Sequence, residues 1–368
     1  MSAAAKNGGD CSVLITGGAG FVGVNLAAHW LAGGERVRIV DSLVRAGSER
    51  NIEWLRRRYP NDVEFVEADV RNASALTAAM QGVEHVVHLA AQVAVTSSLV
   101  NPAFDFDVNA FGTLNVLEAA RRARRAPSLI FTSTNKVYGG LEDLRVRAEA
   151  DRYMPTTERV RTRGIDESRC LDFHSPYGCS KGAAEQYVLD YSRSFGLRTA
   201  VFRMSCIYGP HQHGNEDQGW VAHMVRRALA GDAITIYGDG KQVRDILFVD
   251  DLVAAFDKAR HDIDRLSGRA FNIGGGPENT VSLLELLRHL EQLLERRIER
   301  HFDAWRIGDQ RYYVSDTGRF QNATGWQALT PVAQGLEALR DWLITSELPP
   351  MHRRAPAHVA VRELGVSG

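Results

Sequence analysis

A doubly wound, parallel α/β sheet followed by a smaller C-terminal portion is the fold class that this sequence predicts. Between residues 11 and 210, short apolar runs that suit single strands alternate with stretches of helical period. The first run leads through a glycine-rich turn directly into a helix pattern, as in a Rossmann-type fold. Beyond residue 210 the alternation weakens, so we expect residues 211–345 to form mainly a second portion, with some strands returning to the main sheet.

The first βαβ unit carries the glycine turn. Apolar residues 13–15 predict its first strand, residues 37–40 predict the next one, and a helix pattern lies between them. Gly17, Gly20 and Gly23 stand where the turn must be tight, where backbone must approach a pyrophosphate, and where helix must pack on strand. Because strand, turn and helix are all present, the motif predicts a dinucleotide site with its phosphates at the helix N-terminus.

Asp41 ends the second strand, at the spacing where an acidic side chain accepts hydrogen bonds from the adenosine ribose. A carboxylate there repels the 2′-phosphate of NADP, and Ser42 and Leu43 offer no positive charge in its place. The cofactor that the sequence predicts is therefore NAD. Arg45, close by in the sequence, is the residue that could favour NADP instead.

Four further strands are predicted at residues 63–70, 83–91, 128–139 and 198–210. The loops at the carboxyl ends of parallel strands form the ligand crevice, so residues at those ends should converge there. Each of them has a plain strand-end role as its alternative. These residues are Asp69, Ala90, Ala91, Thr134 and Arg203.

The segment FHSPYGCSKGAAEQY, residues 173–187, places Tyr177 four positions before Lys181 at the start of a helix pattern. This spacing puts both side chains on one helix face. Such a pair also occurs by chance on solvated helices. Beside a dinucleotide, however, the lysine ammonium would stabilise a tyrosine phenolate, whose ordinary pKa is about 10. The pair therefore predicts a proton-transferring group next to a redox cofactor.

Composition argues against several other classes of protein. Of 368 residues, 44 are Lys or Arg and 45 are Asp or Glu, and this formal charge of -1 gives no reason to expect a nucleic-acid or membrane partner. The four cysteines lack the spacing of a zinc site or a disulfide framework, so no metal is expected. Residues 1–10 lack the apolar core of a signal peptide, and no run is long enough to span a membrane. We expect a cytoplasmic protein with a disordered N-terminus and a loose tail at 346–368.

Five short motifs extend the pattern through the chain: TGGAGFVG, HLAA, STNKVYG, YGCSK and QVRDILFVDD. With them, residues 11–345 resemble an extended short-chain dehydrogenase/reductase of the nucleotide-sugar epimerase/dehydratase family. The resemblance implies Tyr177 as acid/base, Lys181 as its partner and ribose ligand, and Thr134 as the hydroxyl that shares the substrate proton. The expected NAD contacts are Gly17, Gly20, Phe21, Val22, Gly23, Asp41, Ser42, Asp69, Val70, Ala90, Ala91, Gln92, Asn109 and Lys181.

The two residues after Thr134 bear on which activity within that family is expected. Relatives that eliminate water typically carry an Asp-Glu pair there, because elimination needs a carboxylic acid and a carboxylate near the sugar. This chain has Asn135 and Lys136 instead. Both residues can also be read as ordinary loop residues, but the carboxylates are missing in either case. The resemblance therefore implies an epimerase rather than a dehydratase.

A nucleotide diphosphate brings negative charge that a nearly neutral chain must meet locally, and guanidinium groups do this with paired hydrogen bonds. On this argument and the resemblance, Arg244 and Arg311 are expected to bind the diphosphate, with surface ion pairs as the alternative. Arg203 and His174 are open between a substrate contact and a structural role. Residues 145–164 predict an exposed, charged insertion. The expected substrate-binding residues are Thr134, Asn135, His174, Arg203, Arg244 and Arg311.

The motifs STNKVYG, DQGW and FNIGGG resemble most closely those of relatives that epimerise CDP-linked hexoses at C2. The expected reaction is transient oxidation of a CDP-hexose to a ketone at C2 and return of the hydride to the other face. The alternatives are a 4-epimerase or other redox-neutral modifier of a different nucleotide sugar, and a non-catalytic regulator that senses NAD. The expected partners are the nucleotide-diphosphate sugar and, since relatives commonly dimerise, a second copy of the chain in a homodimer or higher homo-oligomer.

Overall fold

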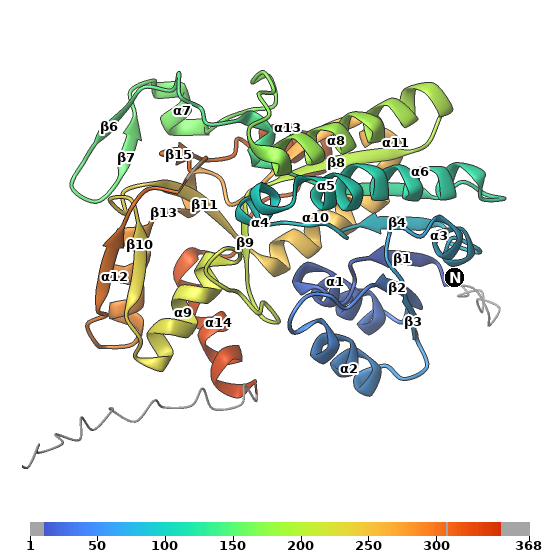
Figure 1. Cartoon of the computed structure of the whole chain (residues 1–368), viewed down its shortest axis with the longest axis horizontal. Coiled ribbons are helices and arrows are strands. Elements are labelled where there is room, and N and C mark those ends of the chain that lie inside the picture. The colour runs from blue at the N-terminus through green and yellow to red at the C-terminus, as the bar shows by residue number, and fades with distance from the viewer. Residues whose placement is uncertain (1–10, 307, 347–368) are drawn as a thin grey trace, which may run out of the picture.

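The structure is a computed structural model that describes residues 11–306 and 308–346 (Figure 1). The expectations for residues 1–10 and 346–368 lie outside this part of the chain, apart from Ser346. A seven-stranded parallel sheet forms the centre, in the order β12-β8-β5-β4-β1-β2-β3, which confirms the predicted doubly wound fold. In chain order its strands are β1 (Val13–Thr16), β2 (Val37–Asp41), β3 (Val63–Glu67), β4 (His85–His88), β5 (Ser128–Thr134), β8 (Thr199–Met204) and β12 (Arg269–Ile273).

Side chains of each strand alternate between two cores, one on each face of the sheet. In β1, Val13 and Ile15 pack into one core, and Leu14 packs into the other. Val13 pairs with Val37 of β2 and with His85 of β4, so these parallel strands run in register. Their carboxyl ends therefore lie along one edge of the sheet, where the following loops meet.

Helices cover both faces of this sheet, as Figure 1 shows. The core of one face is shared by α1 (Phe21–Ala32), α2 (Ser48–Arg58), α10 (Val249–His261), α11 (Ile263–Leu266) and α13 (Gly318–Thr324). The core of the other face is shared by α3 (Ala73–Ala79), the π-helix η1 (Asp107–Phe111), α6 (Gly112–Arg122) and α8 (Ser175–Phe195). Two short helices, α4 (Val95–Val100) and α5 (Pro102–Phe106), pack against α8.

All four strands predicted after the first βαβ unit end earlier than expected, and β3 stops at Glu67 and β4 at His88 instead of at 70 and 91. The strand expected at 128–139 stops at Thr134, whose hydroxyl accepts a hydrogen bond from the Lys136 N–H at 3.2 Å and so begins the 3₁₀-helix η2 (Asn135–Tyr138). The strand expected at 198–210 divides at Ser205, whose hydroxyl donates to the Asp245 carbonyl at 2.9 Å. Its second half, β9 (Cys206–Tyr208), leaves the main sheet and pairs with β11 (Val243–Phe248).

A third core, distinct from those of the main sheet, organises the C-terminal portion. Tyr208 of β9 and Phe248 of β11 belong to it. The remaining elements of this portion are α9 (Trp220–Ala230), β10 (Ile234–Tyr237), η3 (Pro277–Asn279), β13 (Thr280–Ser282), α12 (Leu283–Leu293), β14 (Arg300–Asp303), β15 (Tyr312–Tyr313) and α14 (Val332–Thr345).

The insertion between β5 and α8 has structure of its own. It contains a short hairpin of β6 (Val146–Ala148) and β7 (Tyr153–Pro155), followed by α7 (Glu158–Arg163). Its hairpin and helix lie at the outer edge of the molecule in Figure 1. Among the described residues, we find no helix with the length and apolar character needed to cross a membrane.

Candidate active site

A cavity of about 690 Å³ opens at the carboxyl edge of the main sheet. Its wall takes residues from the loops after β1, β2, β3 and β4 and from the end of β5, as expected for the ligand crevice of a parallel sheet. The residues expected at NAD that line it are Gly17, Gly20, Phe21, Val22, Gly23, Asp41, Ser42, Asp69, Val70, Ala90, Ala91, Gln92 and Lys181.

The glycine turn brings backbone very close to backbone. Gly17 has a φ of 71°, and a Cβ built on it would lie 2.6 Å from the Ala90 nitrogen. A Cβ on Gly23 would lie 2.5 Å from the Gly17 carbonyl oxygen. No side chain caps the start of α1 at Gly20, so this helix N-terminus stays available to an anion. The turn therefore has the shape and the dipole that a pyrophosphate needs.

Asp41 is held in place by the loops on either side of it. Its Oδ2 accepts the Ala19 N–H at 3.1 Å, and its Oδ1 accepts the Leu43 N–H at 2.9 Å. Burial raises the pKa of Asp41, and these backbone donors oppose that rise. Arg45 lines the same cavity, and its charge acts on both Asp41 and Tyr177. The carboxylate that disfavours NADP and the cation that could favour it thus lie in the same cavity.

Ser133 is a cavity residue that the sequence analysis missed. Its Oγ is buried on the cavity wall and has no hydrogen-bond partner among residues 11–306 and 308–346. A buried hydroxyl without a partner is costly, and a polar ligand in the cavity would supply one. The only sequence signal is that Ser133 lies in the hydroxyl run Thr132–Thr134 at a strand end. Together with the glycine turn, this hydroxyl fits a bound dinucleotide.

Tyr177 and Lys181 both reach the cavity from the first turns of α8. Burial raises the pKa of Tyr177 to about 12, while its hydrogen bond with Thr134 and the nearby Arg45 charge oppose the rise. Burial lowers the pKa of Lys181 to about 7, and the Glu185 and Asp105 carboxylates oppose that fall. The structure thus places the predicted tyrosine and lysine on the cavity wall and joins the predicted threonine to the tyrosine by a hydrogen bond.

Thr134 is fixed by the turn that follows β5. Because its Oγ1 accepts the Lys136 N–H at 3.2 Å, the hydroxyl proton is directed elsewhere, toward Tyr177 or toward the Asn135 Oδ1 at 3.3 Å. The Asn135 amide in turn lies 3.5 Å from the Gln310 Oε1. Asn135 therefore stands between the candidate proton relay and the C-terminal portion.

Asn109 supports the cavity from behind and does not line it. Its Oδ1 accepts the Gln92 N–H at 2.9 Å, and its Nδ2 donates to the Gln92 carbonyl at 3.0 Å. The same amide reaches the Ser180 hydroxyl at 3.1 Å, one residue before Lys181. It lies within the π-helix η1, a geometry often found at functional sites. Asn109 thus positions a cavity loop through both of its polar atoms.

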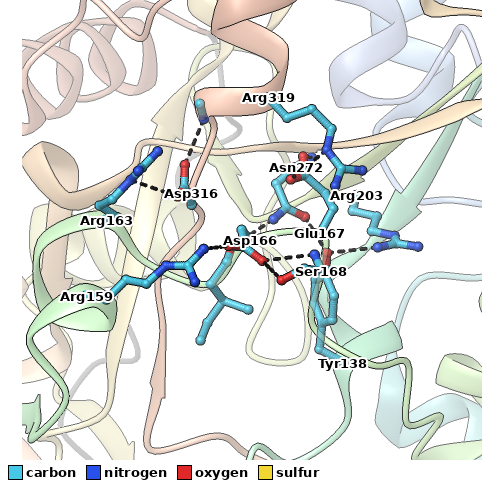
Figure 2. A network of polar contacts seen from close by, with 12 residues as sticks. Tyr138, Arg159, Arg163, Asp166, Glu167, Ser168, Arg203, Asn272, Asp316 and Arg319 are labelled. Carbon is cyan, nitrogen blue, oxygen red and sulfur yellow. Dashed lines mark hydrogen bonds and ion pairs between the residues drawn. The ribbon is translucent and has the colours of Figure 1, made fainter.

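Arg203 is withdrawn from the candidate substrate contacts, because the structure places it in a buried network (Figure 2). Its Nε donates to the Glu185 Oε1 at 3.0 Å, and its Nη1 donates to the Tyr138 hydroxyl at 2.9 Å. That hydroxyl donates to the Asn272 Oδ1 at 2.7 Å, and the Glu167 Oε1 accepts the Asn272 N–H at 2.8 Å. With its fork engaged by these partners, Arg203 has a structural role.

The two other candidate arginines differ sharply in their surroundings. Arg244 is buried, and its Nη2 pairs with the Asp309 Oδ1 at 2.5 Å. Arg311 is exposed and lies over the Tyr153 ring, 5.5 Å from its centroid, on the insertion hairpin. Neither placement tests the expected phosphate contact, so Arg244 and Arg311 both remain candidate diphosphate ligands, one buried beside a carboxylate and the other exposed.

Arg306 is a candidate that the sequence analysis missed. Its Nη1 donates to the Glu216 carbonyl at 2.9 Å and lies 3.5 Å from the Asp217 Oδ1. Asp217 lines the cavity, so Arg306 joins the loop after β14 to the cavity margin. Its position in a loop that contains Gly308 was the only local signal in the sequence.

His174 lies at the N-cap of α8, three residues before Tyr177. Its Nε2 is 3.0 Å from the Asp172 Oδ2, and it does not line the cavity. Ser175, the next residue, has a left-handed φ of 64°, which sets the direction in which the helix begins. This placement favours a structural role for His174 at the helix start.

Comparisons with known proteins identify the family of the chain. The model of the NAD dependent epimerase/dehydratase family matches residues 13–274. CDP-paratose 2-epimerase of Salmonella typhi is 42% identical over 339 residues, which cover 90% of this chain and 98% of the relative. UDP-glucose 4-epimerase of Mycolicibacterium smegmatis is 33% identical over 88% of this chain and 95% of the relative.

Among solved structures, UDP-glucose 4-epimerase of Thermus thermophilus in complex with NAD superposes with a TM-score of 0.76 at 29% sequence identity. The match covers 91% of this chain and 99% of that structure. The fold and the family model therefore agree over most of the chain. The chain belongs to the NAD dependent epimerase/dehydratase family and is an NAD-dependent enzyme.

Proposed function

We propose that this chain is a 2-epimerase of CDP-linked hexoses, acting through Thr134, Tyr177 and Lys181. The observation that carries the proposal is that Tyr177 and Lys181 line the cavity and Thr134 is hydrogen-bonded to Tyr177, while Asn135 and Lys136 follow the threonine. Similarity to CDP-paratose 2-epimerase supports the choice of nucleotide and of carbon. Elimination of water would need carboxyl groups that these two positions lack.

When bound, NAD supplies a hydride acceptor and donor together with a positively charged ring. Tyr177 takes the proton from the substrate hydroxyl and later returns it, and Thr134 passes the proton through its hydrogen bond with Tyr177. Burial raises the pKa of Tyr177, and the positive charge of Arg45 opposes that rise. Lys181, one helical turn further along α8, is proposed as the second cation that favours release of the tyrosine proton. Gly17, Gly23 and Asp41 would hold the pyrophosphate and the ribose.

The alternative with an observation in its favour is a 4-epimerase of another nucleotide sugar. UDP-glucose 4-epimerase of Mycolicibacterium smegmatis is 33% identical to this chain, and such an enzyme uses the same oxidation and hydride return at a different carbon. Product analysis by NMR, after incubation with CDP-, UDP-, GDP- and dTDP-sugars, separates the two. We expect inversion at C2 of a CDP-hexose, and inversion at C4 would overturn the choice of carbon.

Deuterium labelling tests the chemistry itself. A hydride held in a closed site has no route to water, whereas a carbon-bound proton taken by an acid/base group usually exchanges with solvent. A substrate deuterated at C2 should therefore give an epimer that keeps its deuterium, and a reaction in heavy water should add none. If the product instead contains solvent deuterium at C2, the enzyme acts by enolisation and the hydride mechanism is wrong.

We also propose a homodimer formed through the surface of α5, η1 and α8. Three exposed aromatic side chains, Phe106, Phe111 and Tyr187, lie on these elements, and α5 and η1 both pack against α8; an apolar patch formed by such side chains marks an interaction surface. Analytical ultracentrifugation should give a dimer for the wild type and a monomer for Phe106→Glu with Tyr187→Glu. Phe302→Glu, at an exposed phenylalanine of β14, is the control and should leave the dimer intact. A wild-type monomer would contradict the proposal.

A further inference from the structure

Lys136 has a backbone that is fixed beside the proposed catalytic pair. Its N–H donates to the Thr134 Oγ1 at 3.2 Å. Its carbonyl oxygen packs on the start of α8, where a Cβ built on Gly178, the residue after Tyr177, would lie only 3.3 Å away. The side chain of Lys136 therefore starts from a point defined by both the threonine and the tyrosine.

The ammonium of Lys136 reaches toward the C-terminal portion. Its Nζ donates to the Gly308 carbonyl at 3.1 Å, and Arg244, Asp309 and Cys206 are the ionisable groups that act on it. No carboxylate lies within 4 Å of this ammonium in the part of the chain that the structure describes. An ammonium has three donors, so two of them lack a partner from these residues.

Around Lys136 and Arg244, two positive side chains share the negative charge of Asp309. Asp309 is bound by the Arg244 Nη2 at 2.5 Å and lies 3.4 Å from the Gln242 Nε2, so its charge is already engaged. Burial, with the Arg244 charge as a second cause, lowers the pKa of Lys136 to about 8. Two cations that share one carboxylate in a partly buried place are expected to bind an anion.

The chemistry of C2 says which anion this is. C2 is bonded directly to C1, the carbon that carries the diphosphate, whereas C4 lies across the sugar ring. When the C2 hydroxyl meets Thr134 and Tyr177, the sugar-linked phosphate must therefore lie much closer to these residues than it does in a reaction at C4. Lys136, whose side chain begins two residues after Thr134, is suited to bind this phosphate.

Resting on the proposed function, we propose that Lys136 binds the sugar-linked phosphate of the substrate and thereby directs the reaction to C2. Arg244 then engages the same diphosphate beside it. In this role Lys136 is a specificity-determining residue that touches the substrate. A lysine at position 136 takes the place of a carboxylate that elimination of water needs. The same lysine supplies a positive charge for the phosphate that lies next to C2.

The test compares CDP, CMP and cytidine as probes of Lys136→Met in the NAD-loaded protein, by calorimetric titration. CDP carries the second phosphate, CMP lacks it, and cytidine has none. We expect Lys136→Met to weaken CDP binding by about tenfold or more while CMP and cytidine change less than about twofold. NAD content should stay that of the wild type.

The matched control is Lys241→Met, because the Lys241 Nζ also donates to a backbone carbonyl, that of Glu149 at 2.9 Å, but at the insertion hairpin and not beside Thr134. It should leave all three affinities unchanged. If Lys136 only anchors the loop at Gly308, the variant will weaken CDP, CMP and cytidine by the same factor, and the proposal falls. Unchanged CDP affinity in Lys136→Met also overturns it. A wild-type protein that epimerises another nucleotide sugar would instead refute the proposed function, so the two failures are distinguishable.

Discussion

Removing Arg203 should destabilise the enzyme far more than removing an exposed arginine from the same region. The Glu185 side chain is fully buried, and the Arg203 side chain is 7% exposed. In Arg203→Met the carboxylate of Glu185 loses the only guanidinium that donates hydrogen bonds to it among the described residues, and the Tyr138 hydroxyl loses the donor at 2.9 Å. Leaving a buried charge without its partner costs about 3–5 kcal/mol of unfolding free energy.

The matched control lies on α8, the helix that carries Glu185. Arg193 pairs with Asp190 at 2.8 Å, but their side chains are 77% and 44% exposed. Water and salt screen such a pair, so Arg193→Met should cost below about 1 kcal/mol. The pair geometries are similar, and burial is what separates the two predicted costs.

Urea unfolding at pH 7 measures the unfolding free energy that each variant loses relative to the wild type. The dependence of that free energy on urea concentration should be the same in all three proteins. Adding Glu185→Gln to Arg203→Met should recover part of the loss, because a neutral amide replaces the unpaired carboxylate. A cost below about 1 kcal/mol for Arg203→Met would refute the structural role. The same conclusion would follow if the variant kept its stability but lost CDP affinity, since Arg203 would then be a substrate ligand.

Three further predictions concern the site. Tyr177→Phe should lower kcat by about 10²- to 10⁴-fold with NAD content unchanged, measured by turnover and cofactor absorbance; near-normal turnover would exclude Tyr177 as the acid/base. Asp41→Asn should narrow the NAD over NADP preference by about tenfold in competitive binding, because it removes a charge but keeps a hydrogen-bond acceptor; an unchanged ratio would exclude Asp41 as the selector. His88, buried between the hydroxyls of Thr16 at 2.6 Å and Thr113 at 3.0 Å, has its pKa lowered by burial from 6.5 to about 3. Between pH 6.5 and about 3 the unfolded chain therefore binds a proton that the folded chain does not, so the unfolding free energy falls as the pH drops. His88→Gln should reduce this pH dependence of the unfolding free energy by up to about 1.4 kcal/mol per pH unit, measured by urea unfolding at several pH values. An unchanged pH dependence would exclude His88 as its source.

The sequence predicted the parts of the site that depend on neighbours along the chain. The glycine turn, the acidic residue after the second strand, and the Tyr177–Lys181 spacing are each fixed within one βαβ unit or one helix. Local geometry decides such features, because a strand, turn and helix of the right lengths put these groups in place before any distant contact forms. The parallel sheet followed from the same alternation.

Tertiary structure decided what each arginine does. Arg203 and Arg244 both lie in apolar strands, yet Arg203 meets Glu185 and Tyr138 from two other elements, while Arg244 meets Asp309 from a loop 65 residues away. The residues next to an arginine in the sequence do not predict which carboxylate its guanidinium will contact.

Tertiary structure also decided that the Ser133 hydroxyl is buried in the cavity wall without a partner among the described residues. It likewise decided which groups surround the Lys136 ammonium, because these come from residues more than 60 positions further along the chain. The charge state of a group and its freedom to bind a ligand depend on burial and on partners, and only the assembled fold brings those partners within reach.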